Sequence, residues 1–406
     1  MLTNPLTRRS FCTGSLALAA TRAVAAKPES GYARVARTDR TRILTAASAC
    51  VDLPVQTITA FPSPKSPGGP HDFFSQADYF WPNPANPDGP YINRDGQSNP
   101  ANFNDHRKAM IALSIQMPAL TAAWMLTKDK KYGSHAADHL RAWFITPETR
   151  MNTNLEFSQG VHGVSTGRSY GIIDTLHLVE VARAASIIAP RFLNPAEQNA
   201  LRTWFHDYLY WMQHSEKGIT EGKAKNNHAV CWALQASEFA RLVDDERTRA
   251  AIALQFKEVF LPSQMGPDGS FPQELARTKP YSYSIFNFDC MAMICQSLLT
   301  GLPASGPRFA PNLFAFTLPG DSARGICKAA AFLYPYLKDR NAWPYKHDVE
   351  HFDSLPVRSP GLLFTGLACH QPENVALWQQ LNPDPTDPEI IRNYPVRQPL
   401  LWFDHA

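Results

Sequence analysis

The sequence predicts an all-α fold in which antiparallel helix pairs form a single domain. From Asp105 onward, segments of about 15 to 20 residues place their apolar side chains at helical spacing, and Pro-rich loops join them. Alternation typical of β-strands is rare and never accumulates into a series of strands. No Gly/Ser linker or charge run divides the 406 residues, so one continuous helical array fits the sequence better than several independent cores.

The N-terminus has the layout of a secretory signal. The paired arginines Arg8 and Arg9 precede a short apolar run, 11–20, and the small residues 23–25. This order favours export by the twin-arginine route, and the apolar run is too short for a permanent membrane anchor. The alternative is a disordered basic tail. We expect a mature protein that begins near Ala26, has no membrane anchor, and acts in the periplasm or outside the cell.

The expected organisation is a signal peptide at 1–26, an N-terminal extension at 27–70 and one helical domain at 71–406. The sequence has 39 Lys and Arg against 36 Asp and Glu, and its first 25 residues carry three arginines and no acid. The mature chain is therefore formally neutral, with 36 basic against 36 acidic residues. This balance does not favour a nucleic-acid protein, and an anionic ligand would have to be met by a few local groups.

The cysteines and histidines do not indicate a metal site. The seven cysteines are scattered without a CxxC pair, so neither zinc nor a dense disulfide scaffold is expected. Cys231, Cys290 and Cys295 lie in apolar helical patterns and are expected in the core. One cluster offers candidate metal ligands: His347, Asp348, His351 and Asp353. We interpret it as a structured loop, and we expect no metal and no cofactor. The sequence gives no indication of the oligomeric state.

The elements follow in order along the chain. One helix is expected within 27–70, near 39–47. Between Asp78 and Pro100, Pro and Asp-Gly steps predict a rigid, aromatic-rich loop. Further helices are expected at 106–127, 130–144, 171–189, 195–214, 228–243, 246–261, 284–300, 322–338 and 373–381. The helix at 195–214 has the clearest start, with Asn194 as the cap and Glu197 closing a capping box.

The first candidate site is Asn226-Asn227-His228, directly before the apolar run of an expected helix. An asparagine at a helix start is a natural cap, which accounts for one of the two asparagines. A helix N-terminus also offers free backbone N–H groups and the positive end of the helix dipole. Amide and imidazole donors placed there are suited to a carboxylate, so capping and anion binding both stay open.

The second candidate is the segment 273–283, which leads into another expected helix. Pro280 breaks any helix that contains Arg277, so Arg277 and Tyr283 can both project from the approach to that helix. The alternative is a surface arginine and a half-buried tyrosine.

The third candidate is the amide-rich loop 151–171, which also leads into a helix. Its polar side chains suit the recognition of hydroxyl and carboxylate groups, although any one of them could instead be structural. The candidates for binding are Asn154, Gln159, His162 and Arg168.

These segments resemble the alginate-lyase-like polysaccharide lyases. The resemblance covers roughly residues 70–360. It rests on Asn226-Asn227-His228 with Trp232, on Glu274-Leu275-Ala276-Arg277 with Tyr283, on the loop 79–96 with its Trp-Pro-Asn-Pro and Arg-Asp-Gly elements, and on 154–171. Tyr283 lies six positions after Arg277 and begins the run Tyr-Ser-Ile-Phe-Asn. This arrangement is closer to polysaccharide lyase family 38 than to family 5, and it leaves Tyr281 as the alternative catalytic tyrosine.

The resemblance implies a fold and a reaction. The fold is an (α/α) toroid or barrel whose long Pro- and aromatic-rich loops frame a groove for an acidic polysaccharide. The reaction is metal-independent β-elimination at 1,4-linked uronate, as in mannuronate-type alginate or glucuronan, which leaves 4,5-unsaturated uronate ends.

The resemblance also implies roles for individual residues. Tyr283 is the expected proton-transfer residue, and Asn227, His228 and Arg277 would stabilise the charge that builds on the substrate carboxylate. His228 as the base, with Tyr283 as the acid, is the alternative. Arg277 is also expected to lower the pKa of a nearby tyrosine. Further substrate contacts are expected from Tyr79, Trp81, Tyr91, Asn154, Gln159, His162, Arg168, Asn226, Glu274 and Tyr281.

Two other functions fit parts of the sequence. A glycoside hydrolase on a helical barrel needs two carboxylates, and Glu156, Glu274 and Asp289 are available. Only Glu274 sits in a motif, where Arg277 is its expected partner. A non-catalytic periplasmic binder of acidic polysaccharide would use the same cations and amides, but it would gain nothing from a tyrosine beside Arg277.

Overall fold

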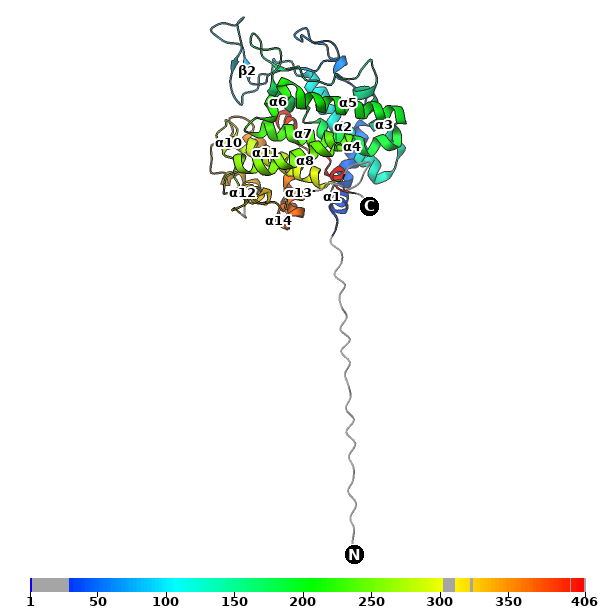
Figure 1. The fold of residues 1–406 in the computed structure, drawn as a ribbon, viewed down its shortest axis with the longest axis vertical. Coiled ribbons are helices and arrows are strands. Elements are labelled where there is room, and N and C mark those ends of the chain that lie inside the picture. Colours follow the sequence, from blue (N-terminus) through cyan, green and yellow to red (C-terminus); the bar gives the residue numbers. More distant parts are fainter. Residues whose placement is uncertain (2–28, 302–310, 322–323, 395, 405–406) are drawn as a thin grey trace.

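The computed structural model describes residue 1 and residues 29–301, 311–321, 324–394 and 396–404. Apart from residue 1, the predicted signal peptide lies outside the described residues, as does the expected start of the mature chain. The described chain is mainly helical, and its helices form two layers of a toroid, which confirms the all-α prediction (Figure 1).

The inner layer consists of helices that pack against one another in chain order. α2 contacts α4, α4 contacts α7, α7 contacts α11, and α11 contacts α13. Their bounds are α2 Asp105–Thr127, α4 Leu178–Phe192, α7 Asn227–Val243, α11 Pro280–Leu299 and α13 Pro360–Ala368. Helix α11 is buried along almost its whole length from Ser284 to Leu298. Such a helix is apolar around most of its surface because neighbours enclose it.

The outer layer consists of helices that alternate with the inner ones along the chain. Their bounds are α1 Gly31–Cys50, α3 Lys130–Leu140, α5 Pro195–His214, α8 Glu246–Gln255, α12 Ile326–Lys338 and α14 Pro372–Gln380. Each packs on one or two inner helices: α1 on α2, α3 on α2 and α4, α5 and α8 on α7, α12 on α11 and α13, and α14 on α13.

Shorter elements complete the described chain. The short α-helices are α6 Glu216–Gly222, α9 Leu261–Gln264, α10 Pro272–Leu275 and α15 Pro388–Arg392. The π-helical turns are η2 Arg141–Ile145 and η4 Phe256–Phe260, and the 3-10 turns are η1 Ile58–Ala60, η3 Ser169–Thr175, η5 Arg340–Ala342, η6 Phe352–Ser354 and η7 Pro399–Trp402. Strand β1 (Phe74–Gln76) pairs in parallel with β4 (Phe157–Gly160), and β2 (Phe80–Trp81) pairs antiparallel with β3 (Ile92–Asn93).

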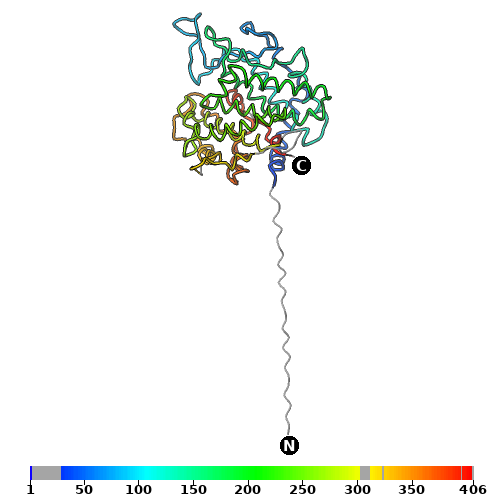
Figure 2. The backbone as a smooth tube through the Cα atoms, viewed as in Figure 1, coloured from blue at the N-terminus to red at the C-terminus, as the bar shows by residue number. Residues whose placement is uncertain are grey.

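Helix α1, the first helix of the described chain, lies beside the C-terminal end of the chain (Figure 2). The C-terminal turn η7 packs against α1, α2 and α4. The guanidinium of Arg358, just before α13, donates to the Asp39 carboxylate of α1 at 2.7 Å, and both side chains are buried. The side-chain amide of Gln379 donates to the Thr38 hydroxyl at 3.1 Å. These contacts connect the last helices of the layer to the first.

Several helix boundaries differ from those predicted. Helix α1 spans all of 31–50 rather than 39–47, and its buried residues Val35, Ile43 and Ala47 join the common core. The segment predicted as an extension thus contributes a helix to the outer layer. Helix α4 begins at Leu178, seven residues later than predicted, because the preceding residues form the 3-10 turn η3. Helices α6 and α13 were not predicted at all.

Two further expectations concern buried positions. Cys231, Cys290 and Cys295 are free and buried, as predicted. A disulfide between Cys327 and Cys369, which the spacing did not indicate, joins α12 to the residue after α13. Among the described residues, α2 alone is long and apolar enough to cross a membrane, and 72% of its apolar window is buried inside the protein. Its composition is that of a core helix.

The start of α5 has the capping box that the sequence predicts. The Asn194 side chain accepts from the Glu197 backbone N–H at 3.0 Å, and the Glu197 carboxylate accepts from the Asn194 backbone N–H at 2.9 Å, which is the predicted capping box. We expect Asn194→Ala to lower the free energy of unfolding by about 1 kcal/mol, because the Glu197 backbone N–H loses its acceptor. Chemical denaturation measures this; an unchanged midpoint would show that the cap adds nothing.

Candidate active site

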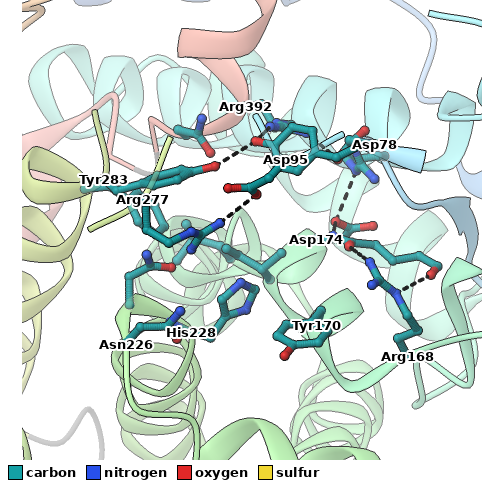
Figure 3. Close-up of a pocket in the computed structure, with 18 of the residues that line it drawn as sticks. Asp78, Asp95, Arg168, Tyr170, Asp174, Asn226, His228, Arg277, Tyr283 and Arg392 are labelled. Atoms are coloured by element: carbon teal, nitrogen blue, oxygen red, sulfur yellow. Dashed lines mark hydrogen bonds and ion pairs between the residues drawn. The ribbon is translucent and has the colours of Figure 1, made fainter. Parts of the chain in front are cut away.

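The inner helices begin around one cavity of about 400 Å³ (Figure 3). The first turns of α2, α7 and α11 and the residue before α4 all contribute to its wall. The lining residues are Asp78, Tyr79, Phe80, Asn93, Asp95, Arg107, Gln159, Arg168, Tyr170, Ile173, Asp174, Leu176, His177, Asn226, Asn227, His228, Arg277, Tyr283, Phe286, Arg392 and Asn393. Helix N-termini carry partial positive charge, so this end of the toroid favours an anion.

Tyr283 lies in the first turn of α11 with its ring under a guanidinium. The Arg277 Cζ atom is 4.6 Å from the Tyr283 ring centroid, and the Tyr283 hydroxyl is 3.0 Å from the Tyr79 hydroxyl. Burial raises the pKa of Tyr283 well above its ordinary value, and the neighbouring Tyr79 adds to this rise. Arg277 and Arg392 both act to lower it. The predicted effect of Arg277 is therefore present, but burial outweighs it in the ligand-free protein.

His228 is held through one ring nitrogen. Its Nδ1 is 2.5 Å from the buried Glu221 carboxylate, and its ring lies edge-on to Tyr170 with centroids 4.9 Å apart. A carboxylate partner keeps the proton on Nδ1, so in the neutral ring Nε2 carries the lone pair. Within the described part of the chain Nε2 has no hydrogen-bond partner. His228 can therefore accept a proton at Nε2 or, once protonated, donate one to an anion.

Asn227 is fixed by Glu274. The Asn227 backbone N–H donates to one Glu274 carboxylate oxygen at 2.7 Å, and the side-chain amide donates to the other at 2.6 Å. Asn226 caps α7 by accepting from the His228 backbone N–H at 3.3 Å. Glu274 is fully buried behind the cavity wall, so its place is to orient Asn227 rather than to touch a ligand.

Arg277 has a different partner from the one predicted. Its guanidinium donates to Asp95 at 3.0 Å, and the neighbouring Thr278 hydroxyl donates to the other Asp95 oxygen at 2.8 Å. Burial opposes ionisation of Asp95, but the bond from Arg277 holds its pKa below the ordinary value. The expected Arg277–Glu274 pair is wrong because Glu274 is occupied by Asn227. The loop 78–100 thus supplies an acid that orients the arginine.

A second guanidinium lies on the opposite wall (Figure 3). Arg168 lies between the Phe80 and Tyr170 rings, with its Cζ 4.8 and 5.2 Å from their centroids. Its Nε and Nη2 donate to the backbone and side-chain oxygens of Gln159 at 3.1 and 3.0 Å. The Gln159 amide in turn donates to Asp174 at 3.1 Å. Nη1 of Arg168 has no hydrogen-bond partner among the described residues and is available to a substrate carboxylate or hydroxyl.

The structure brings together most of the predicted site residues, and the following predicted residues line the cavity: Tyr79, Gln159, Arg168, Asn226, Asn227, His228, Arg277 and Tyr283. Asn154, Trp81, Tyr91 and His162 do not. The Asn154 side chain accepts from the Glu156 backbone N–H, and Trp81 donates to the Gln97 carbonyl. The Tyr91 and His162 rings contact each other at 5.2 Å. Asn154 and Trp81 are thus engaged within their own loops, and Tyr91 and His162 with each other between two loops.

Tyr281 belongs to the core rather than to the cavity. It is fully buried, and its hydroxyl donates to the Tyr336 carbonyl at 2.8 Å. Its ring packs edge-on against Trp343 and Phe352. Residues two apart on a helix point to nearly opposite sides, so Tyr281 and Tyr283 cannot both face the ligand. The alternative of Tyr281 as the catalytic or substrate-binding tyrosine is wrong on this geometry.

The acidic and histidine cluster after Trp343 performs a structural role. The Asp348 carboxylate accepts from the Tyr281 and Ser282 backbone N–H groups at 2.8 and 2.9 Å, and thereby caps the start of α11. His351 is bound to Asp387 at 2.7 Å. In the described ranges no three His, Cys, Asp or Glu side chains come together in a metal-binding arrangement. The interpretation of this cluster as a structured loop is consistent with these contacts.

Sequence reasoning missed several residues that line or support the cavity. They are Asp78, Arg107, Asp174, Glu221 and Arg392. Arg107 pairs with Asp78 at 2.7 Å and with Asp174 at 3.1 Å, and Arg392 also pairs with Asp78. Burial opposes ionisation of Asp78, yet the two arginines hold its pKa below the ordinary value. These ion pairs join distant segments, so no local sequence pattern marks them.

Comparisons with known proteins agree with this arrangement. The sequence profile of the family described as alginate lyase matches residues 57–343. An alginate lyase from Bacteroides ovatus has 26% identity and a TM-score of 0.75, and the alignment covers 92% of this chain and 97% of that chain. Two tetrasaccharide complexes of alginate lyase A1-III variants have 14% identity and TM-scores of 0.49 and 0.48, over 84% of this chain and 87% of theirs. No curated protein sequence matches significantly.

The profile spans most of the chain, and the Bacteroides structure shares its helical architecture over nearly its full length. The chain is therefore a polysaccharide lyase, and it belongs to the alginate lyase family.

Proposed function

We propose that this lyase cleaves a 1,4-linked uronate polymer, mannuronate-type alginate or glucuronan, by metal-independent β-elimination. The observation that carries the proposal is the cavity that combines Tyr283, Arg277 and the α7 N-terminus with Asn227 and His228. An anion-binding helix start, a guanidinium and a proton-transfer group are the parts that this reaction requires at one uronate unit.

The reaction removes the proton at C5, beside the carboxylate, and expels the sugar oxygen at C4. The C5 proton is weakly acidic, so the enzyme must stabilise the extra charge that builds on the carboxyl oxygens. The second hydrogen of the Asn227 side-chain amide and the Nε2–H of protonated His228 are donors for those oxygens, and the α7 N-terminus adds the positive end of its dipole. Arg277 adds a fixed positive charge beside Tyr283. Together these groups replace the neutralising role that a metal ion performs in other enzymes.

Tyr283 is the proposed proton-transfer residue. Its hydroxyl takes the C5 proton as the base and, reprotonated, gives a proton to the departing C4 oxygen. Burial keeps the Tyr283 proton on the ligand-free protein, so the proton must leave when the substrate is in place. One residue can perform both steps only if the proton and the leaving group lie on the same side of the sugar ring. That holds for β-mannuronate and β-glucuronate and not for guluronate.

The hydrolase alternative is not favoured by this site. A glycosidase needs one carboxyl with a raised pKa as the acid. Glu156 binds Trp211 and Lys217, and Asp289 accepts from Ser359 and Gly361 in the core. Neither lines the cavity, and nor does Glu274, whose pKa burial raises but whose two oxygens both accept from Asn227. Of the three acids that line the cavity, Asp78 and Asp95 have lowered pKa values, which suits ion pairing and not acid catalysis, and Asp174 is paired with Arg107 at 3.1 Å.

The substrate assignment is tested with purified mature protein on polymannuronate, polyguluronate and glucuronan, with and without a metal chelator. The proposal predicts unsaturated ends from polymannuronate or glucuronan, an unchanged rate with chelator, and little product from polyguluronate. Product from polyguluronate alone would contradict the single-residue mechanism, because that epimer needs separate groups for the two proton transfers. Loss of activity with chelator would contradict metal independence.

Glu221 gives a test of how His228 is oriented. We expect Glu221→Gln to lower kcat/KM about 10- to 100-fold, because a hydrogen bond to a charged group contributes roughly 1.5–3 kcal/mol. Glu156→Gln is the matched control, since Glu156 binds Trp211 outside the cavity. Equal rates for the two variants would show that Glu221 does not support the reaction.

We also propose that the enzyme works after export, in the periplasm or outside the cell. The proposal rests on the twin arginines and the small residues 23–25 of the sequence. A fusion of residues 1–26 to a reporter should be exported in a twin-arginine-dependent manner, and replacement of Arg8 and Arg9 by Lys should abolish export.

A further inference from the structure

One guanidinium of the cavity has no acidic partner. Of the arginines that line the cavity, three are paired with carboxylates: Arg107 with Asp78 at 2.7 Å, Arg277 with Asp95 at 3.0 Å and Arg392 with Glu389 at 2.6 Å. The fourth, Arg168, has no Asp or Glu oxygen within 4.0 Å in the described part of the chain. Burial lowers the pKa of Arg168, and neighbouring groups offset this only in part. Because burying an unpaired charge is costly, Arg168 is the cation that the cavity leaves for an anionic ligand.

The free N–H groups of Arg168 form a fork. Its Nε–H and one N–H of Nη2 donate to Gln159, which leaves the second N–H of Nη2 and those of Nη1 at the end of the guanidinium. The Phe80 and Tyr170 rings, 4.8 and 5.2 Å from its Cζ, hold the plane of this group. Parallel N–H groups on two nitrogens match the two oxygens of a carboxylate better than a single hydroxyl. The open end of Arg168 is therefore suited to a carboxylate.

Gln159 fixes this orientation from a strained backbone position. Its φ of 49° lies in the left-handed region, which residues other than glycine rarely adopt, and its backbone and side-chain oxygens both accept from Arg168. The other end of its amide donates to Asp174 at 3.1 Å, and Asp174 is itself bound to Arg107 at 3.1 Å and to the Ser75 hydroxyl at 2.6 Å. A guanidinium only donates and a carboxylate accepts, so a reversed amide would lose both contacts. Gln159, predicted as a substrate contact, thus has both ends of its amide engaged within the protein.

Arg168 lies away from the groups that meet the reacting carboxylate. Figure 3 shows it on the wall opposite Tyr283. The Tyr170 ring contacts both His228, with centroids 4.9 Å apart, and Arg168. The proposed elimination assigns Asn227 and His228 to the carboxylate of the reacting unit, so Arg168 is left for another carboxylate. In a uronan every unit carries one, and the neighbouring unit supplies it.

We propose that Arg168 binds the carboxylate of the uronate next to the one that reacts, and that Gln159 and Asp174 are positioning residues for its guanidinium. The inference rests on the proposed function and deepens it, because the enzyme then selects two consecutive uronates. Polymers in which a uronate alternates with a neutral or amino sugar lack the second carboxylate and should be poor substrates.

The sugars that flank the cleaved bond test this proposal. Polymannuronate or glucuronan is partly carboxyl-reduced, so that random units carry a neutral hydroxymethyl group, and the products are sequenced by mass spectrometry. With the natural protein, neutral units should be depleted about 10- to 100-fold at one position beside the reacting unit, the factor that a hydrogen bond to a charged group represents. Arg168→Gln should accept neutral units there. Arg202→Gln, in an arginine of α5 outside the cavity, should keep the natural pattern.

Kinetics on the unmodified polymer separate this binding role from a role in the chemical step. Arg168→Gln should raise KM and keep most of kcat, because the neighbouring unit gains no charge in the transition state. A loss confined to kcat would contradict the proposal.

The same product pattern tests the positioning residues. Gln159→Met keeps the size of the side chain but removes both amide contacts, and Asp174→Asn removes the charge that fixes the amide. Each should weaken the selection against neutral units, and neither should change the pattern of Arg168→Gln when the two are combined. A purely structural role would lower stability and activity but leave the selection unchanged, and that result would overturn the positioning role.

Failure of this proposal is distinguishable from failure of the proposed function. Neutral units accepted on both sides of the cleaved bond, or a natural pattern in Arg168→Gln, would overturn the proposal while elimination persists. If the unmodified polymers give no unsaturated ends, the proposed function is refuted, and calorimetry with a uronate tetramer tests the site alone. The natural protein should bind the tetramer about 10- to 100-fold more tightly than Arg168→Gln does, and equal affinities would overturn the site.

Discussion

Replacing Tyr283 by Phe is expected to reduce elimination by about 10²–10⁴-fold or more, the range that loss of a proton-transfer group produces. The Phe ring can keep its place under the Arg277 guanidinium, 4.6 Å from its Cζ, so the cavity should keep its shape. Only the hydroxyl and its contact with Tyr79 are lost. The turnover number is measured by ultraviolet absorbance, and oligouronate affinity by calorimetry.

Tyr281→Phe is the matched control for this prediction. It removes a hydroxyl from a tyrosine two positions away, which donates to the Tyr336 carbonyl in the core. We expect a loss of about 1 kcal/mol in the free energy of unfolding and little change in turnover. If Tyr281→Phe stopped the reaction and Tyr283→Phe did not, the assignment of the catalytic tyrosine would be wrong.

His228→Ala is expected to lower kcat/KM by about 10²–10³-fold, the effect of removing one donor from a site that stabilises a developing anion. The loss should be greatest in kcat, because the carboxyl oxygens gain most of their charge in the transition state. His206→Ala, in an exposed histidine of α5 bonded to Asp207, is the control for removal of an imidazole.

A second substitution at this position separates the two roles of His228. Gln provides an amide donor close to the position of Nε2 but cannot take a proton at neutral pH. If His228 only binds the carboxylate, His228→Gln should recover part of the activity that His228→Ala loses on polymannuronate or glucuronan. If His228 is the base, Gln and Ala should be equally inactive, and Tyr283 would then be the acid alone.

The sequence predicts the layers of the fold well where helices are long and amphipathic. The capping box at Asn194 and the start of α7 are local features; the structure has the capping box as predicted and begins α7 at Asn227, one residue before the predicted start. The start of α11 is four residues earlier than predicted because Pro280 occupies the first helical position, where its missing N–H costs nothing. Helix α13 was missed because a Pro-Gly pair precedes a short apolar run that has no helical period.

The sequence predicted those residues of the candidate site that lie in short local motifs. Asn227, His228, Arg277 and Tyr283 lie in motifs at two helix starts, and the toroid brings those starts together. Glu221 escaped prediction because it lies near the end of the short helix α6, seven residues before His228, and the contact depends on how the chain turns between α6 and α7.

Local sequence patterns missed Arg392, which lines the cavity, and wrongly placed two loop aromatics in it. Arg392 reaches Tyr79 only because the C-terminal segment folds back over the start of the chain, an arrangement with no local pattern. Trp81 and Tyr91 were predicted as sugar platforms from their residue type, yet Trp81 binds within its own loop and Tyr91 packs against His162 of another loop. Residue type suggests what a side chain can do, and the packing decides whether it is free to do it.

The most direct test of the central claim compares ultraviolet absorbance with new reducing ends in one reaction on polymannuronate or glucuronan. Elimination forms one double bond, conjugated to the carboxyl group, for each chain cleaved, whereas hydrolysis forms none. The account predicts one absorbing end for each new reducing end with the natural protein, and neither signal with Tyr283→Phe. New reducing ends without absorbance would contradict it and would identify the chain as a hydrolase.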